Sequence, residues 1–347
     1  MRAQGVLRHS LVGAAAVALL VGVVGCSGDP GTPGGGTSSA PPVVASGVTF
    51  SLSPGSLTNI AEYVGIDMGF FEKYGIVDSE IIPSNAGSTT LQLLAAGQLD
   101  FGAISIPATI LAEQSSGVEM RVAVGMMKKY PASLVCNEDV NVSEDYPQGI
   151  KDLKGLTIAS DSPTSSSTAD LLVALRDNGV DPSEVNLVYI SGGLAPTVAA
   201  LTSKQVQCAM LWEPGQTQMG DSVKTVLDIA QDKAPDVVNN AWYNLLTVTK
   251  DYADKNPAVI EAVQRAMVEI TEYLADPDNA TEVAKAEAAR YPDFSVEDLA
   301  KVIARLAPVQ GAEITQEQYD ACIQIFNIAN QQNIDTPYED LILPLPK

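Results

Sequence analysis

Residues 88–126 read STTLQLLAAGQLDFGAISIPATILAEQSSGVEMRVAVGM, and this stretch decides the fold class. Ser88 to Ala96 carries apolar residues at helical spacing before a glycine, and Leu99 to Ile104 is typical of a strand. A second helix is expected around Ala108 to Gln114, and a further strand over Met120 to Met126. Strands that alternate with helices predict an α/β fold, with parallel pairing and crossover helices between the strands.

The same alternation extends on both sides of this stretch. Further strands are expected at Val48 to Leu52, Ser79 to Pro83, Ser133 to Cys136, Leu156 to Ala159, Val185 to Ile190, Gln207 to Leu211 and Tyr243 to Thr249, with helices at Leu57 to Met68, Ser165 to Asn178 and Leu194 to Leu201. The length favours two lobes over one core. We expect one lobe from 48–128 and 241–347, which ends in a helical part, and the other from 129–240. A ligand would bind in the cleft between the lobes.

The N-terminal part is expected to be an export signal followed by a tether. Two arginines precede the apolar run from Leu11 to Val24, which is too short to cross a bilayer. The small residues before Cys26 resemble the bacterial lipobox, in which the cysteine is lipidated and becomes the mature N-terminus. We therefore expect a signal peptide at 1–25, a lipid on Cys26 and a flexible tether rich in Gly, Pro and Ser at 26–47. This layout predicts a lipid-anchored, extracytoplasmic protein on the cell membrane.

Charge and composition exclude several classes of function. The chain has a formal net charge of −22 at pH 7, with 20 Lys and Arg against 42 Asp and Glu. Such an acidic balance argues against nucleic acid as a partner, because phosphates require basic surface. The one histidine, His9, lies in the expected signal peptide, so no imidazole base and no histidine metal ligand remains after cleavage. We therefore expect no catalytic residues, no metal and no cofactor.

Three cysteines remain besides Cys26. They are Cys136, Cys208 and Cys322, in a compartment where disulfides persist. The odd number allows one bridge. Cys136 and Cys208 lie in strand-like runs of the same expected lobe and are the favoured candidate pair, while three buried free thiols are the alternative.

Hydroxyl-rich junctions between strands and helices are the candidate ligand contacts. In the second lobe, the segment 161–168 offers its hydroxyls and the free N–H groups of a helix N-terminus to an anion or a carbonyl oxygen, although one of these residues could serve only as a helix cap. The candidates in this segment are Ser162, Thr164, Ser165, Ser166 and Ser167. In the first lobe the equivalent positions are Ser53, Ser56, Ser105 and Pro107.

Two other segments of the second lobe are also candidates. Gly192 and Gly193 would let the backbone approach a ligand closely, or would simply make a turn. Trp212 and Glu213 follow a strand at the expected mouth of the cleft, where an aromatic face and a carboxylate could hold a ring or an amine. The alternative for Trp212 is packing within the lobe. A carboxylate from Glu213 in the pocket would disfavour a bare inorganic anion.

Several short motifs occur in an order that resembles a known family. They are Gly69-Phe70-Phe71-Glu72-Lys73-Tyr74-Gly75-Ile76, Leu94-Ala95-Ala96-Gly97-Gln98-Leu99-Asp100-Phe101-Gly102, Ile150-Lys151-Asp152-Leu153-Lys154-Gly155-Leu156-Thr157-Ile158-Ala159 and Trp212-Glu213-Pro214. Their order over about 48–275 is similar to that of the nitrate, sulfonate, taurine and thiamine-precursor binding proteins of ABC importers. One motif departs, since Lys204 to Cys208 lacks the glycine and the acid of the family's second Gly-Gln-Val-Asp turn.

The resemblance implies a two-lobe periplasmic-binding-protein fold of type 2. It also implies capture of a small organic molecule or anion, of the sulfonate, nitrate or pyrimidine class, by a monomer that delivers it to ABC permease subunits. Two other functions stay open at this point. One is a ligand-sensing lipoprotein without a transport role, and the other is an enzyme on the same fold, against which the missing histidine and the export signal count.

Overall fold

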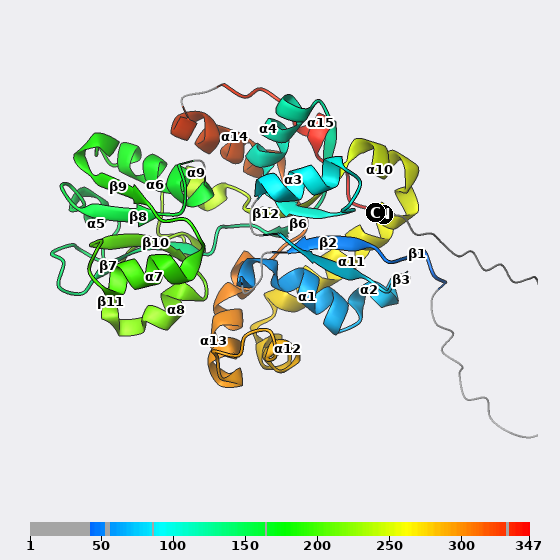
Figure 1. Ribbon diagram of the computed structural model, residues 1–347, viewed down its shortest axis with the longest axis horizontal. Helices are drawn as coiled ribbons and strands as arrows, with labels where there is room; N and C mark the ends of the chain where they lie inside the picture. The colour runs from blue at the N-terminus through cyan, green and yellow to red at the C-terminus, as the bar shows by residue number, and fades with distance from the viewer. Residues whose placement is uncertain (1–41, 53–55, 85–86, 164, 331–332) are drawn as a thin grey trace, which may run out of the picture. The chain divides into compact units, whose positions relative to one another are not determined.

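The structure is a computed structural model that describes residues 42–52, 56–84, 87–163, 165–330 and 333–347 (Figure 1). The expected signal peptide and Cys26 lie outside the described residues. The folded part begins before Val48, because the N–H groups of Val44 and Ala45 both donate to the Gly75 carbonyl and start the short strand β1. None of the described helices combines the length and the hydropathy that a membrane span requires.

The middle of the chain forms a five-stranded sheet, which we call the second sheet. Its strand order is β11-β7-β10-β8-β9. The strands are β7 (Ala132–Asn137), β8 (Thr157–Ser160), β9 (Asn186–Tyr189), β10 (Cys208–Trp212) and β11 (Val223–Asp228). As expected, β8 is parallel to β9 and to β10. The expectation of parallel pairing throughout is wrong, because β7 runs antiparallel to both β10 and β11.

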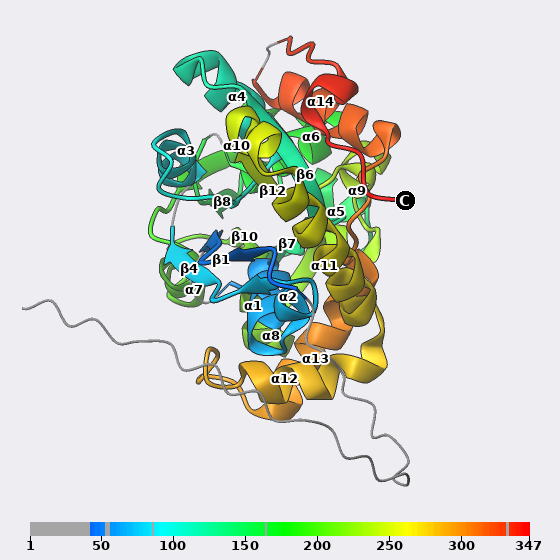
Figure 2. The same ribbon diagram turned by 90° about the vertical axis from the view of Figure 1, so that its right-hand side faces the viewer.

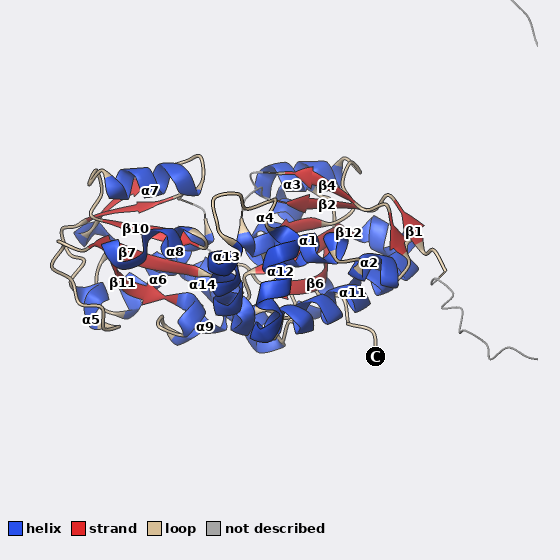
Figure 3. Cartoon of the chain, turned by 90° about the horizontal axis from the view of Figure 1, so that it is seen from below, coloured by secondary structure: helices blue, strands red, loops and turns tan. Residues whose placement is uncertain are grey.

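Helices cover both faces of the second sheet (Figure 3). Successive side chains of a strand point to opposite faces, and the central strands carry apolar side chains on both, so each face needs a covering layer. On β7 and β10, Leu134 and Met210 pack with the apolar side of α6, while Val135, Ala209 and Leu211 pack with that of α7. The helices of this part of the chain are α5 (Gln148–Lys151), α6 (Ser166–Asp177), α7 (Leu194–Thr202), α8 (Gly215–Met219) and α9 (Asp236–Asn240), with single 3-10 turns at Pro182–Glu184, Gly220–Ser222 and Ile229–Gln231.

The two ends of the described chain form the first sheet. The strands β2 (Thr49–Leu52) and β4 (Glu80–Pro83) pair in parallel, and a bridge between Phe50 and Phe101 joins them to the antiparallel set β5-β12-β6. These strands are β5 (Gly102–Ile104), β6 (Met120–Met127) and β12 (Asn244–Thr249), and β1 (Ala45–Ser46) pairs separately with β3 (Ile76–Val77). The strand β12 is antiparallel because the chain enters it from the second sheet.

Helices from both chain ends pack around the first sheet (Figure 2). The long helix α11 begins at Pro257 and buries Val263, Met267 and Ile270, a spacing of three and four residues that faces one side inward. The elements are a 3-10 turn at Leu57–Asn59, α1 (Ile60–Asp67), α2 (Phe70–Lys73), α3 (Gly87–Ala95), α4 (Ile106–Ser116), α10 (Lys250–Lys255), α11 (Pro257–Ala275), a 3-10 turn at Pro277–Asn279, α12 (Ala280–Glu287), α13 (Val296–Leu306), a 3-10 turn at Ala307–Val309, α14 (Gln316–Asn330) and α15 (Tyr338–Leu341).

Two short segments carry the chain between the sheets. The first, 128–131, links β6 to β7, and the second, 241–243, leads into β12. Tyr130 from the first and Tyr243 from the second stack with their ring centroids 4.1 Å apart and their planes 13° from parallel. The N–H of Tyr243 also donates to the Met127 carbonyl, so the two segments lie side by side.

The last helices begin at capping residues, and they contact both sheets. Ser295 accepts from the Asp298 N–H at the start of α13, and Thr315 accepts from the Gln318 N–H at the start of α14. The helix α14 packs against α6 and α9 on the second sheet as well as against α4 on the first. Our division at 241 therefore assigns to the first lobe a helix that also covers the second sheet.

Cys136 on β7 and Cys208 on β10 are register partners in the second sheet and form a disulfide. They are 72 residues apart in the sequence, so the bridge closes a long loop. Both are fully buried. The third cysteine, Cys322, is a buried free thiol on α14.

We predict that the double variant Cys136→Ala, Cys208→Ala loses about 2–4 kcal/mol of unfolding free energy, because the unfolded chain regains the entropy of a long loop. Urea unfolding measures the difference. A reductant should lower the transition midpoint of the wild type and of the control variant Cys322→Ala, and should leave the double variant unchanged. An equal response of all three proteins would show that the bridge contributes nothing to stability.

Candidate functional site

A cavity of about 770 Å3 is lined by residues of both sheets. This volume lies in the range of about 300–1,000 Å3 that is usual for small-molecule sites. The first sheet contributes residues that follow β2, β4 and β5, and the second sheet contributes residues that follow β8 and β9 together with Trp212, the last residue of β10. The ends of parallel strands are where an open α/β sheet can present loops and helix N-termini to a ligand.

Hydroxyl groups and helix N-termini dominate the polar lining of this outer cavity. Ser105 caps α4 and Ser165 caps α6, and each accepts a hydrogen bond from the N–H three residues later, at 3.5 and 3.2 Å. In the first turn of α4 only the Ile106 N–H stays free, because Pro107 has no N–H and those of Ala108 and Thr109 donate to Ser105, so the helix N-terminus of α6 offers more donors than that of α4. The hydroxyl of Ser166 makes no hydrogen bond within the described part of the chain, so it is available to a ligand. This arrangement can bind carbonyl, hydroxyl or acidic oxygens.

The Tyr130 and Tyr243 pair borders both the outer cavity and a smaller inner one. Tyr130 is buried, and burial raises the pKa of its phenol well above the usual range. Burial also raises the pKa of Tyr243. Both phenols are therefore neutral at physiological pH and offer O–H groups and ring faces.

The inner cavity has a volume of about 70 Å3 and contains one carboxyl group, that of Asp170 on α6. Its other walls are mostly apolar and include Trp242 and, from α14, Ile325 and Cys322. Trp242 fits because it packs onto Gly125, where an added Cβ would lie 2.1 Å from the indole ring. The two cavities share Ser105, Tyr130, Ser165, Ser166 and Tyr243.

Asp170 is a buried carboxyl without a partner among the described residues. Its side chain is 6% exposed, and it makes no hydrogen bond or ion pair there. Burial raises the pKa of Asp170 to about 8. At neutral pH the empty protein therefore holds this group mostly protonated, because a lone charge in an apolar cavity is costly.

No basic side chain reaches either cavity. After the expected signal peptide the chain has 18 Lys and Arg, all within the described ranges, and none of them lines the outer or the inner cavity. The charged lining residues are acidic, Asp161 in the outer cavity and Asp170 in the inner one. The carboxylate of Asp161 accepts from the Ser167 hydroxyl at 2.5 Å. In the described part of the chain, no group of three or more His, Cys, Asp or Glu residues is arranged to hold a metal ion.

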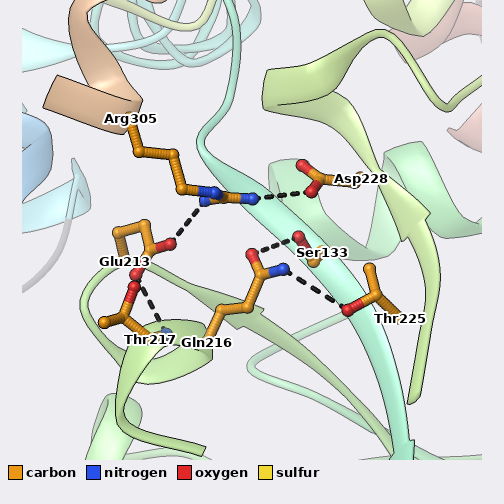
Figure 4. A network of polar contacts seen from close by, with 7 residues as sticks. All are labelled: Ser133, Glu213, Gln216, Thr217, Thr225, Asp228 and Arg305. Atoms are coloured by element: carbon orange, nitrogen blue, oxygen red, sulfur yellow. Dashed lines mark hydrogen bonds and ion pairs between the residues drawn. The ribbon is translucent and has the colours of Figure 1, made fainter. Parts of the chain in front are cut away.

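A polar network fixes the strand end next to the outer cavity (Figure 4). Arg305 on α13 donates to Glu213 at 2.5 Å and to Asp228 at 2.6 Å, and Glu213 also accepts from the Thr217 N–H at 3.2 Å. Glu213 is fully buried, and burial raises the pKa of its carboxyl more than Arg305 lowers it. The network holds the backbone beside Trp212, whose side chain borders the outer cavity.

The structure brings most of the candidate residues to the cavities. Those that line one or both are Ser56, Ser105, Pro107, Ser162, Ser165, Ser166, Gly192, Gly193 and Trp212. Ser53 and Thr164 lie outside the described residues. The position of Glu213 differs from our expectation, because its carboxylate is used in the Arg305 network. Ser167 is buried in the first turn of α6, where its hydroxyl donates a hydrogen bond to the Asp161 carboxylate.

Sequence reasoning missed the two tyrosines and the two aspartates of the site. Tyr130 and Tyr243 lie in the segments that cross between the sheets, and an aromatic residue at each predicted crossing was a usable signal. Asp161 begins the segment already singled out for its hydroxyls. Asp170 carried no signal, since an aspartate one turn into an amphipathic helix is usually solvated.

Comparison with known proteins assigns the chain to a family. The model of the NMT1-like family matches residues 54–288, which is more than half of the chain. The chain belongs to the NMT1-like family. The match includes both crossing segments and the whole second sheet, whereas α13 and α14 of this NMT1-like protein lie beyond it. A comparison with curated proteins gave no match.

Solved structures with the same fold include three binding proteins. The aliphatic sulphonate binding protein SsuA from Escherichia coli is 18% identical, with a TM-score of 0.67 over 83% of this chain and 92% of that one. The alkanesulfonate-binding SsuA from Xanthomonas axonopodis, bound to MOPS, is 17% identical (TM-score 0.61; 85% and 93% covered). The nitrate-binding protein NrtA from Synechocystis is 17% identical (TM-score 0.59; 81% and 76% covered). The NMT1-like chain therefore has the periplasmic-binding-protein fold.

We predict that Arg305→Met lowers the free energy of unfolding by about 3 kcal/mol, because it leaves Glu213 buried without a cation. The loss should be larger at pH 8 than at pH 5, since protonation of Glu213 relieves the unpaired charge. Urea unfolding at both pH values measures it. The control is Arg265→Met, which breaks an exposed pair with Glu261 and should cost less than about 1 kcal/mol. Equal losses for the two variants would contradict the role given to Arg305.

Proposed function

We propose that this protein is an extracytoplasmic binding protein that captures a small organic molecule in the outer and inner cavities and delivers it to an ABC importer. The observation that carries the proposal is the cavity of about 770 Å3, lined by hydroxyls, helix N-termini and aromatic rings of both sheets. Membership of the NMT1-like family supports it. So does the shared fold with sulfonate- and nitrate-binding proteins.

Capture without catalysis is the activity that the lining favours. The cap serines Ser105 and Ser165 both hold helix N-termini, and neither cavity contains a histidine or a lysine that could activate them as nucleophiles. Buried hydroxyls and neutral phenols are suited to hydrogen bonding a ligand that leaves unchanged. We therefore propose a binding role and no enzymatic one.

Delivery requires a change that a permease can recognise. Residues of both sheets line the cavity, so a ligand that contacts both sets favours the arrangement in which the sheets close over it. The segments 128–131 and 241–243 are the points about which such a movement would occur. We propose that the closed, liganded monomer is the form that permease subunits bind.

In this proposal the N-terminal segment anchors the protein to the membrane. The lipobox-like sequence before Cys26 would place a lipid on that residue, and the Gly-, Pro- and Ser-rich stretch that follows would separate the folded part from the membrane surface. An anchored binding protein stays close to its permease, which raises the local concentration of captured ligand.

We predict that the protein expressed in a bacterium with lipoprotein processing enters the membrane fraction and incorporates labelled palmitate. Cys26→Ala should abolish both, while Cys322→Ala, which alters a buried thiol on α14, should keep both. Fractionation and metabolic labelling measure the two outcomes. Palmitate incorporation that survives Cys26→Ala would contradict lipidation at this residue.

We predict that at least one compound from a panel of sulfonates, nitrate, pyrimidines, flavins and amino acids stabilises the protein against heat. At 100 times its Kd a ligand adds about 2.7 kcal/mol, which corresponds to a few degrees in Tm. The variant Ala108→Trp fills the outer cavity and should lose this response, whereas Ala258→Trp on the exposed side of α11 should keep it. No response to any compound, and no small molecule released from the purified protein in mass spectrometry, would overturn the proposal.

A further inference from the structure

The inner cavity contains an acidic group that the fold does not use. Asp170 makes no hydrogen bond or ion pair with a described residue, in contrast to Asp161, which accepts from Ser167. A buried carboxyl without a partner destabilises a protein, because it has lost its hydrogen bonds to water. A hydrogen-bond donor or a cation that reaches the carboxyl offsets this free-energy cost. The side chain is 94% buried and borders a cavity with room for a small group.

Neither cavity provides the charge that would attract an anion by Coulomb forces. All 18 Lys and Arg that follow the expected signal peptide lie elsewhere. Helix N-termini and hydroxyls in the outer cavity can still hold an oxygen atom of a ligand. The two cavities therefore suit different chemical groups of a ligand. The outer cavity offers hydrogen-bond donors to an oxygen atom, and the inner cavity offers a carboxyl.

We propose that the ligand carries a basic nitrogen, as an ammonium or amidinium group, that enters the inner cavity, which Tyr130 and Tyr243 also line, and pairs there with Asp170. The inference rests on the proposed function and narrows its ligand class. The remaining part of the ligand lies in the outer cavity, against the N-termini of α4 and α6. The phenols of Tyr130 and Tyr243 are neutral and add no charge of their own to the inner cavity.

Binding of such a group depends on pH in a defined direction. Because burial raises the pKa of Asp170 to about 8, the empty site is protonated at pH 6, and a cation binds the ionised form. Affinity for a strong base therefore rises with pH from 6 to 8, by up to about tenfold per unit. The other titratable groups that interact with Asp170 are Tyr130, Tyr243 and Cys322. Burial raises the pKa of Cys322 to about 12, and that of both phenols, so these three stay protonated over this range.

The test uses matched pairs of compounds that differ in the basic nitrogen: benzamidine with benzamide, and taurine with ethanesulfonate. In the wild type we expect the basic member of at least one pair to bind tenfold or more tightly than its partner by calorimetry, and benzamidine to bind more tightly at pH 8 than at pH 6. Asp170→Asn should weaken this binding tenfold to a hundredfold and remove the pH dependence. Glu62→Gln, which alters another fully buried carboxyl with a pKa of about 8 that borders neither cavity, should keep it.

Three results would overturn the inference. One is that neither basic compound binds better than its partner, and another is that Asp170→Asn binds as the wild type does. The third is an affinity that falls as pH rises, which would indicate a protonated Asp170 donating to a neutral ligand. If a compound without basic nitrogen binds best and Ala108→Trp blocks it, the proposed function stands and the inference about its ligand fails. If Asp170→Asn does not fold, the compound pairs and the pH series in the wild type still decide.

Discussion

The stacked rings of Tyr130 and Tyr243 join the two segments through which the chain passes between its sheets. Such a stack contributes about 0.5–1.5 kcal/mol beyond the area it buries. Its position matters more than this energy, since the same rings line both the outer and the inner cavity. Any movement of one sheet relative to the other must pivot close to them. The stack thus connects the path of the chain, the wall of the site and the proposed closure over a ligand.

The basic side chains of the protein lie away from the two cavities. Most Lys and Arg side chains are exposed, several in helical ion pairs of little energetic weight such as Lys255 with Asp251. Arg305 differs, because it reaches the buried carboxylates of Glu213 and Asp228 and so ties α13 to the second sheet. This use of Glu213 removes it from the site. The acidic character of the site comes instead from Asp161 and Asp170.

The C-terminal helices complete the site although the family match ends before them. From α14, Cys322 and Ile325 form part of the wall of the inner cavity, and the same helix packs on α6 just where Asp170 lies. Without α14 that face of α6 would be open to water, and the carboxyl would be solvated. The burial of Asp170 and the raised pKa of its carboxyl therefore depend on a helix some 150 residues away in the sequence.

Local sequence patterns predicted much of the secondary structure of this protein. Spacing of apolar residues predicted most helices and strands to within a few residues, because side-chain periodicity reflects which face is buried. The hydroxyl-rich segment 161–168 marked the start of α6. The second sheet shows the limit of such reasoning. Whether β7 runs parallel or antiparallel to β10 depends on the direction from which the chain arrives, which leaves no trace in a strand six residues long.

The sequence by itself determined the α/β class, the family motifs, the hydroxyl-rich helix starts, and the absence of histidine from the expected mature chain. Only the tertiary structure decided that Cys136 faces Cys208, that Glu213 pairs with Arg305, and that Asp170 borders a cavity beside two tyrosines. The physical reason is one of range. Helix, strand and cap depend on neighbours within a few residues, whereas burial and charge pairing depend on elements that are distant in the chain and meet only when it has folded.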